Sequence, residues 1–227
     1  MGAKGLVTGV VALGLVAVGA YVADGYARGN AEDQAAAVVT QQLQVDGTPD
    51  VQIAGFPFLT QLLARSLDDV TATAPGVVLD GIAATDVTVD AHDVSLDAPY
   101  RVGSVLIEAT VATASVQEIV SERTSLELAV DGDVLRAAGD LFGMPLTAGL
   151  VPRVEAGRLL VDVQDVTLGA ATLRLEQLPG DVAEQLVGIE VPLEGLPAGV
   201  VLERAVVVPD GVRFTAAGAD VVLEQAP

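Results

Sequence analysis

The chain of 227 residues contains no cysteine and no tryptophan, a single histidine, four phenylalanines and three tyrosines. The absence of cysteine excludes disulfides, thiolate metal ligands, cysteine nucleophiles and lipids attached through cysteine. A domain without disulfides has to be held together by its apolar core. About 200 residues are enough to bury such a core.

Positive charge is also scarce. Eleven Lys and Arg residues stand against 31 Asp and Glu residues, which gives a formal net charge of −20, and Lys4 is the only lysine. Binding to nucleic acid requires a basic surface that contacts phosphates, so the composition predicts no nucleic-acid partner. Broad electrostatic attraction to an anionic membrane is disfavoured for the same reason.

Apolar residues, in contrast, make up 51% of the chain, and its mean hydropathy is +0.54. The segment from Gly5 to Ala23 contains no charged residue. As a helix it would span ~28 Å, about the thickness of the hydrocarbon core of a bilayer. Its length favours a retained single-pass signal-anchor, and the alternative is a cleaved signal peptide with Val18-Gly19-Ala20 as the cleavage site. Lys4 favours a cytoplasmic N-terminus, and in both cases the remainder is exported.

Three regions follow from this pattern. Residues 1–23 are the signal-anchor or signal peptide, and residues 24–44, rich in alanine, glutamine and charge, are predicted to form a helical stalk or first helix. Residues 45–227 contain no linker or low-complexity tract. They are predicted to form a single domain.

From Leu67 onward, apolar and polar residues alternate, which is typical of strands with one buried face. Turn residues at intervals of roughly 8–12 predict an antiparallel meander, with hairpins at 131–133 and 209–211. Short helices are predicted over 115–123 and 178–188. The expected fold is therefore α+β and dominated by strands.

The stretch IAGFPFLTQLLAR, Ile53 to Arg65, is the densest group of bulky apolar residues after the N-terminus. Pro57 favours an extended residue before it and the first turn of a helix after it. The sequence predicts a short helix that Arg65 ends. Three leucines share one face of that helix: Leu59, Leu62 and Leu63.

Catalytic patterns are absent from the sequence. His92 precedes an aspartate, but adjacent residues of a strand point to opposite faces, and no serine occupies a nucleophile-elbow context. The pair Asp131 and Asp133 is typical of a hairpin turn rather than a calcium loop, and Asp162 and Asp165 are interpreted as solvated charges. Phosphate loops, dinucleotide fingerprints and zinc spacings do not occur. We therefore expect no catalytic residue, no metal and no cofactor.

The surplus of valine, leucine and alanine in the strands needs a partner for one whole sheet face. The predicted helices are few and short, so they cannot cover it. Either the sheet folds on itself around a dry core, or it leaves a cavity that a lipid fills. The residue pattern leaves both arrangements open.

The segment from Val51 to Pro75 resembles the LmeA-type family of actinobacterial phospholipid-binding proteins. The likeness is carried by Gly55-Phe-Pro-Phe-Leu-Thr-Gln-Leu-Leu63, followed by Asp69-Val-Thr71. The end of the chain, LPAGVVLERAVVVPDGVRF, is similar to the closing hairpin of that family, and the apolar N-terminal segment also fits. One departure is Ala64-Arg-Ser66, where the family pattern has an Ala-Gly-Arg-type run.

The resemblance implies a fold like that of the tubular lipid-binding proteins, a long curved antiparallel sheet around a few short helices that encloses an apolar pocket. It implies a non-catalytic protein that binds phospholipid at the outer face of the cytoplasmic membrane and supports maturation of mannan-containing lipoglycans. The alternative is an envelope scaffold with a dry core that binds protein or glycan partners.

The same resemblance implies which residues form the lipid site. Gly55 and Pro57 would shape the turn, and an anionic head group would need a local arginine. The expected pocket lining is Phe56, Phe58, Leu59, Leu62, Leu63 and Val70. The candidate arginines are Arg65, Arg101, Arg123 and Arg153.

Overall fold

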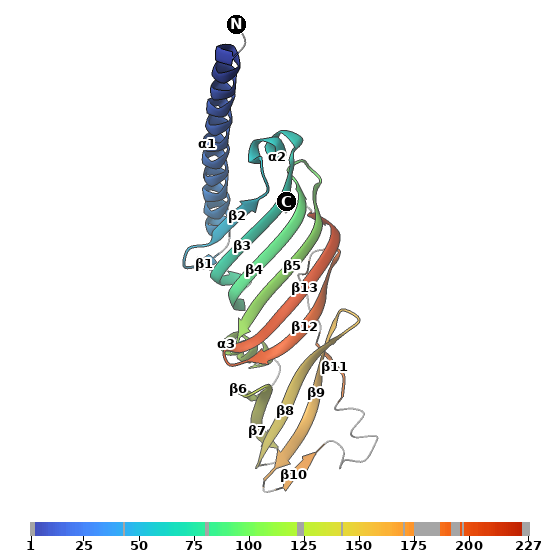
Figure 1. The fold of residues 1–227 in the computed structure, drawn as a ribbon. Coiled ribbons are helices and arrows are strands. Elements are labelled where there is room, and N and C mark those ends of the chain that lie inside the picture. The colour runs from blue at the N-terminus through green and yellow to red at the C-terminus, as the bar shows by residue number, and fades with distance from the viewer. Residues whose placement is uncertain are drawn as a thin grey trace.

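The computed structural model of the protein describes residues 3–42, 44–79, 82–121, 125–141, 143–169, 171–174, 187–191, 196 and 198–223, with side chains of the first helix described from Ala20. Figure 1 shows the arrangement. The helices are α1 (Ala3–Gln42), α2 (Phe58–Ala64) and α3 (Thr113–Ser121). The strands are β1 (Gln44–Asp46), β2 (Asp50–Ala54), β3 (Ser66–Leu79), β4 (Ile82–Ser95), β5 (Tyr100–Ala112), β6 (Glu127–Asp131), β7 (Val134–Leu141), β8 (Met144–Glu155), β9 (Arg158–Leu168), β10 (Ala171–Arg174), β11 (Ile189–Val191), β12 (Val200–Val208) and β13 (Gly211–Leu223).

Helix α1 is continuous over 40 residues, from the charge-free N-terminal segment into the alanine-rich stretch that follows. Its length is ~60 Å at 1.5 Å per residue. Its alanine and glutamine residues favour the helical conformation. After the helix and the short strand β1, a turn that begins at Gly47 reverses the direction of the chain. Figure 1 shows that the N-terminal half of α1 projects beyond the sheets. Among the residues described, no helix combines the length and the apolar character needed to cross a membrane.

A seven-stranded antiparallel sheet forms the part of the protein next to α1. Its order is β1-β3-β4-β5-β13-β12, and β2 also pairs with β3. The C-terminal hairpin lies beside β5, with Val212 opposite Val111 and Gly218 opposite Val105. Residues about 100 positions apart in the sequence are therefore neighbours in this sheet.

The strands of this sheet are longer than the spacing of turn residues predicts. β3 and β4 each run for 14 residues, and Pro75 lies inside β3 instead of ending it. Proline is tolerated there because its missing N–H has no ladder partner. β2 pairs with β3 up to Thr73 and β1 pairs from Gly76, so Pro75 falls between the two ladders.

A second antiparallel sheet is built from the chain between α3 and β12. Its order is β10-β9-β8-β7-β6, and β11 pairs with β9. The predicted hairpin at 131–133 is present, since Asp131 pairs with Val134 across the turn. The hairpin at 209–211 is present as well and joins β12 to β13. The prediction of a strand-dominated antiparallel fold with an N-terminal helix is confirmed, with the strands divided between two sheets.

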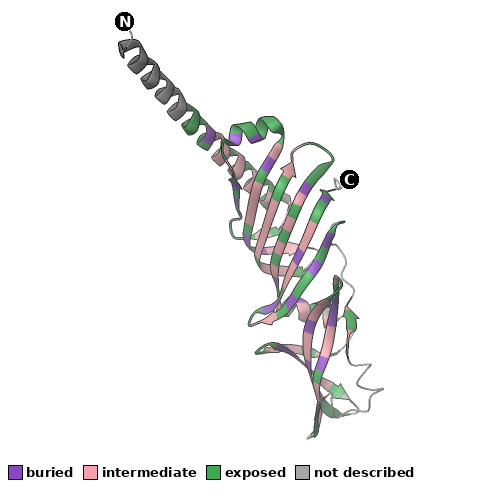
Figure 2. Cartoon of the chain, turned by 45° about the vertical axis from the view of Figure 1, so that its right-hand side comes forward, coloured by how far each residue is buried: buried purple, intermediate pink, exposed green. Residues whose placement is uncertain are grey.

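The main apolar core joins the two sheets. It contains buried side chains of the first sheet, such as Val212 and Val221, together with Leu135 and Leu159 of the second. Strand β12 lies between the sheets and contributes Leu202 to this core. Along the strands, buried residues alternate with partly buried and exposed ones (Figure 2). The period of two in the sequence thus marks the inward face of each sheet.

Helix α3 begins two residues earlier than the sequence predicts, at Thr113 instead of Ser115. The hydroxyl of Ser115 accepts a hydrogen bond from the backbone N–H of Ala83 at 3.0 Å, so it ties the helix to β4. The N–H of Thr113 donates to the carbonyl of Asp210 at 3.0 Å, so the C-terminal hairpin fixes the start of α3. The helix predicted over 178–188 lies almost entirely outside the described residues.

Candidate functional site

An apolar cavity of about 270 Å³ lies between the two sheets and under α3. Its lining comes from both sheets and from the helix, and every lining residue that the structure describes is apolar. Strands β4, β5, β6, β8, β9 and β11 contribute part of the wall, and the remainder includes Val116 and Val120 of α3, Leu135 and Ala137 of β7, and Val212 and Phe214 of β13.

The chemistry of this lining decides what the cavity can hold. No polar atom of the described residues lines it, so a water molecule inside would find no hydrogen-bond partner among them. Apolar cavities smaller than this one stay dry and accept apolar ligands. The volume lies just below the ~300–1,000 Å³ of common ligand pockets. The site can therefore accommodate part of a hydrocarbon chain and offers nothing to a charged group.

The alternation of β7 separates the cavity from the charges of the second sheet. Leu135 and Ala137 line the cavity, and Arg136 between them belongs to the opposite face. Arg136 pairs with Asp165 at 2.6 Å and with Asp131 at 3.3 Å. Hydrogen bonds to Asp165 and Asp131 raise the pKa of Arg136 above its ordinary value. The guanidinium therefore stays charged and on the outer face, which leaves the inner face apolar.

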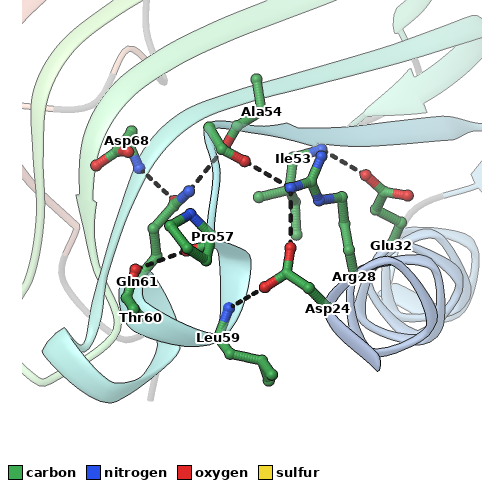
Figure 3. Close-up of polar contacts among 11 residues, drawn as sticks. Asp24, Arg28, Glu32, Ile53, Ala54, Pro57, Leu59, Thr60, Gln61 and Asp68 are labelled. Atoms are coloured by element: carbon green, nitrogen blue, oxygen red, sulfur yellow. Dashed lines mark hydrogen bonds and ion pairs between the residues drawn. The ribbon is translucent and has the colours of Figure 1, made fainter. Parts of the chain in front are cut away.

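A second feature lies at the other end of the first sheet, where α2 meets α1 (Figure 3). As predicted, α2 follows Pro57, and Arg65 ends it in the left-handed conformation with φ 54°. Gly55 has φ 89°, and a Cβ at this position would lie 2.8 Å from the carboxylate of Asp68. Gln61 is buried, accepts a hydrogen bond from the N–H of Asp68 and donates to the carbonyl of Ala54. These contacts define the tight turn before α2.

Three charged residues of α1, spaced four apart, hold this turn. Asp24 accepts a hydrogen bond from the N–H of Leu59 at 2.8 Å and thereby caps α2, which has no side-chain cap of its own. Arg28 donates to the carbonyl of Gly55 at 2.5 Å. Glu32 accepts from the N–H of Ile53 at 2.7 Å. Residues four apart share one face of a helix, so these three form a single polar stripe, which we call the α1 clamp.

The electrostatics of the clamp centre on Asp24, whose surface is 3% exposed. Burial alone would raise its pKa, but the backbone N–H groups of Leu59 and Phe58 and the guanidinium of Arg28 outweigh burial and hold the pKa of Asp24 below its ordinary value of 3.8. A carboxylate with a lowered pKa stabilises the fold above its unfolded-state pKa. That contribution is lost as the pH falls through the lower, folded-state value.

Replacing Asp24 by asparagine is therefore expected to lower the melting temperature at pH 7. The difference from the unmodified protein should shrink below about pH 3.8, because protonated Asp24 no longer favours the folded state. Thermal melts of both proteins at pH 7 and pH 3, followed by circular dichroism, measure this. Asp33→Asn removes the same charge from an exposed position of α1 and should have little effect at either pH. Equal decreases in the melting temperature of the two variants would contradict a stabilising role of the α1 clamp.

The residues predicted to line a lipid pocket all lie at the α2 end. Phe58 is buried in a small second core with Ile53 and Leu67, and the partly buried Val70 packs against that core. The other four are exposed: Phe56, Leu59, Leu62 and Leu63. None of the six belongs to the described lining of the cavity between the sheets. Their role in lipid binding stays a prediction.

Of the candidate arginines, the three that the structure describes are absent from the cavity lining. Arg65 forms an exposed ion pair with Asp97 at 2.8 Å. Arg101 is exposed on β5. Arg123 lies outside the described residues. The head group of a lipid held in the cavity would therefore have to lie beyond its described walls.

The fourth candidate arginine, Arg153, is held by two carboxylates of the second sheet. It pairs with Glu155 at 2.6 Å and with Asp162 at 2.7 Å. Hydrogen bonds to Glu155 and Asp162 raise its pKa above the ordinary value. Asp162, interpreted from the sequence as a solvated charge, is thus part of an ion-pair network.

The single histidine lies on the exposed surface of the first sheet. His92 contacts the carboxylate of Asp69, which lies directly opposite on β3. This cross-strand pair agrees with the interpretation of a surface histidine. Within the described ranges, no group of three or more acidic or histidine side chains is arranged to hold a metal ion.

The cavity residues carry no separate signal in the sequence. Leu128 and Leu135 belong to strands with the usual alternation. Buried and exposed residues also alternate along β12, which contributes to the main core but not to the described lining of the cavity. Only the pairing of strands shows which apolar residues face an empty space. The α2 residues are conspicuous in the sequence instead, because they are bulky and adjacent.

Two antiparallel sheets surround a cavity whose described lining residues are all apolar, and this arrangement defines a protein suited to hold an apolar ligand. The model of the LmeA-like phospholipid-binding family matches residues 22–217, most of the chain. The protein belongs to this family, and membership supports a lipid-binding role. No curated protein and no solved structure matches the chain significantly.

Proposed function

We propose that this protein is a non-catalytic phospholipid-binding protein of the cell envelope, and that the cavity between the sheets receives an acyl chain. The observation that carries the proposal is the apolar character of every described residue that lines the cavity, in a chain that belongs to a phospholipid-binding family. A cavity of about 270 Å³ holds a segment of one chain. The remainder of the lipid and its head group then extend beyond the described walls.

The energetics favour exchange over permanent capture. Burying an acyl chain is worth ~0.8 kcal/mol per methylene relative to water. A lipid that comes from a membrane is already buried, so moving it into the cavity changes its free energy only slightly. A protein of this kind can therefore take up a lipid from one membrane site and release it at another.

We further propose that the protein acts at the outer face of the cytoplasmic membrane, attached through residues 1–23. The length and the charge-free composition of Gly5 to Ala23 support this attachment. By resemblance to its family, the protein would supply or hold lipid during maturation of mannan-containing lipoglycans. Its net charge of −20 does not prevent binding of an anionic head group, because exposed charges are screened beyond ~8–10 Å at ordinary salt.

The proposal is tested by filling the cavity. Ala137 is 3% exposed and lines the cavity on β7, so Ala137→Phe places a ring in the space that the acyl chain would occupy. The full chain and the variant are purified, extracted with organic solvent and analysed for lipid by mass spectrometry. We expect phospholipid with the unmodified protein and loss of most of it from Ala137→Phe.

A matched control comes from the next residue. Ala138 lies on the same strand but on the opposite face, so Ala138→Phe makes the same change outside the cavity. It should retain the lipid. Melting temperatures of both variants show whether each is folded. An unmodified protein that carries no lipid and takes none from liposomes would contradict the proposal and favour an envelope scaffold with a dry core.

A further inference from the structure

Helix α2 turns its apolar face to solvent. Leu63 is 86% exposed and Phe56 is 64% exposed, although both are large apolar side chains. Tyr21 of α1 is 67% exposed and its ring lies 5.8 Å from that of Phe56. We call the exposed group the α2 patch: Tyr21, Val22, Phe56, Leu59, Leu62 and Leu63. Large apolar side chains exposed together on α2, the turn before it and the neighbouring part of α1 are typical of an interaction surface.

The α1 clamp fixes this patch at one level along α1. Asp24 caps α2 and Arg28 holds the turn before it, so α2 lies beside the middle of α1 (Figure 3). The charge-free segment Gly5 to Ala23 ends at this level. Figure 1 shows α2 at the end of the first sheet from which the N-terminal half of α1 projects. If the charge-free segment enters a bilayer, the α2 patch lies at the bilayer surface.

The charge distribution favours a lipid surface as the occupant. No residue from Ile53 to Ala64 is charged, in a chain with a net charge of −20. The nearest acid of α1, Asp24, is 3% exposed and paired with Arg28, so it presents no negative charge outward. Tyr21 lies near the end of the charge-free segment, and tyrosine is one of the aromatic residues enriched at bilayer interfaces.

We propose that the α2 patch contacts the surface of the lipid bilayer and orients the sheets relative to it. The inference rests on the proposed membrane attachment and is independent of whether the cavity holds a lipid. The sheets then extend away from the membrane, with β10 at the distant end. The bulky residues around Pro57 are, in this view, a membrane-contact element separate from the acyl-chain cavity.

The absence of tryptophan provides a direct test. Leu63→Trp introduces the only tryptophan of the chain at the most exposed position of the patch. The full-length variant is reconstituted into vesicles of equal parts phosphatidylcholine and phosphatidylglycerol, with or without brominated acyl chains. We expect a blue-shifted emission and strong quenching by the brominated lipid. Leu173→Trp, at an exposed leucine of β10, is the matched control and should show neither.

Three outcomes would overturn the inference. The indole of the Leu63→Trp protein could emit like a solvated one and escape quenching. It could be quenched no more than the indole of the Leu173→Trp protein. It could also shift to the blue without lipid and in proportion to protein concentration, which would indicate a contact between two copies of the chain. Co-purifying lipid, measured in parallel, separates these failures from a failure of the proposed cavity function.

A second variant tests whether a negative charge in the α2 patch weakens its contact with the bilayer. Leu62→Glu in the Leu63→Trp protein places a carboxylate in the patch at an exposed site, where the fold tolerates it. We expect quenching of the introduced tryptophan to fall several-fold, while the lipid bound in the cavity is unchanged. Unchanged quenching would contradict contact of this face with the bilayer.

Discussion

Replacing Phe58 by alanine is expected to lower the free energy of unfolding by about 3–5 kcal/mol. Phe58 is 1% exposed, one of the largest fully buried side chains among the described residues. It packs with Ile53 and Leu67 of the first sheet and near Ala27 and Ala31 of α1. Removing the ring leaves a cavity between a helix and a sheet that the α1 clamp holds in place, so the surroundings cannot collapse around it.

The control lies two residues away. Phe56 is on the other side of Pro57 and is 64% exposed, so Phe56→Ala removes the same ring from a solvated position. We expect the free energy of unfolding to fall by less than about 1 kcal/mol, mostly because the contact with Tyr21 is lost. Thermal melts followed by circular dichroism should show a fall of about 10 °C for Phe58→Ala and little change for Phe56→Ala. Similar shifts for the two variants would refute the packing described for α2.

Replacing Gly211 by alanine is expected to destabilise the protein by about 3 kcal/mol or more. Gly211 has φ 157° and lies where the C-terminal hairpin approaches β5. A Cβ there would overlap the backbone carbonyl of Val111 and lie 3.0 Å from the N–H nitrogen of Thr113. These atoms belong to the backbone of a paired strand and to the start of α3, so neither can move aside as a flexible side chain would.

Gly132 provides the comparison for Gly211→Ala. It lies in the turn of the hairpin between β6 and β7, with φ 66°, and a Cβ added to it would have no neighbouring atom within 4 Å. Gly132→Ala should therefore lower the free energy of unfolding by only about 1–2 kcal/mol, which is the cost of an alanine in the left-handed conformation. Denaturation midpoints of both variants measure which substitution destabilises the protein more. If Gly132→Ala lost as much as Gly211→Ala, conformational strain alone would explain both and the close approach to β5 would not matter.

The Gly211 variant also reports on the candidate site. Asp210 accepts the hydrogen bond from Thr113 that fixes the start of α3, and α3 covers the cavity. Any Gly211→Ala protein that folds should carry less lipid than Gly132→Ala protein. This difference links the C-terminal hairpin, which is remote in sequence, to the function proposed for the cavity.

Local features of the fold are predictable from the sequence because their causes are local. Pro57 sets the start of α2 by restricting its own φ and the residue before it. Asp131-Gly132 and Asp210-Gly211 fix two hairpins because glycine allows the turn conformations. The charge-free N-terminal segment and the alternation along the strands likewise indicate α1 and a strand-dominated fold.

The orientation of α2 is not predictable in the same way. The spacing of Leu59, Leu62 and Leu63 places them on one face, and apolar faces usually point inward. The structure buries Phe58 and Gln61 instead and exposes the leucines. The cause is tertiary, because Asp24 of α1 holds the N-terminus of α2 and Arg28 holds the turn before it.

The residue pattern alone therefore accounts for the strand-dominated class, the hairpins, the excess of negative charge and the apolar N-terminal segment. Three features depend on tertiary contacts: β5 pairs with β13, the chain between α3 and β12 forms a second sheet, and a cavity lies between the sheets. Alternation shows that a residue faces inward but does not show what it meets there. That depends on pairing between strands far apart in the chain, for which a local pattern carries no signal.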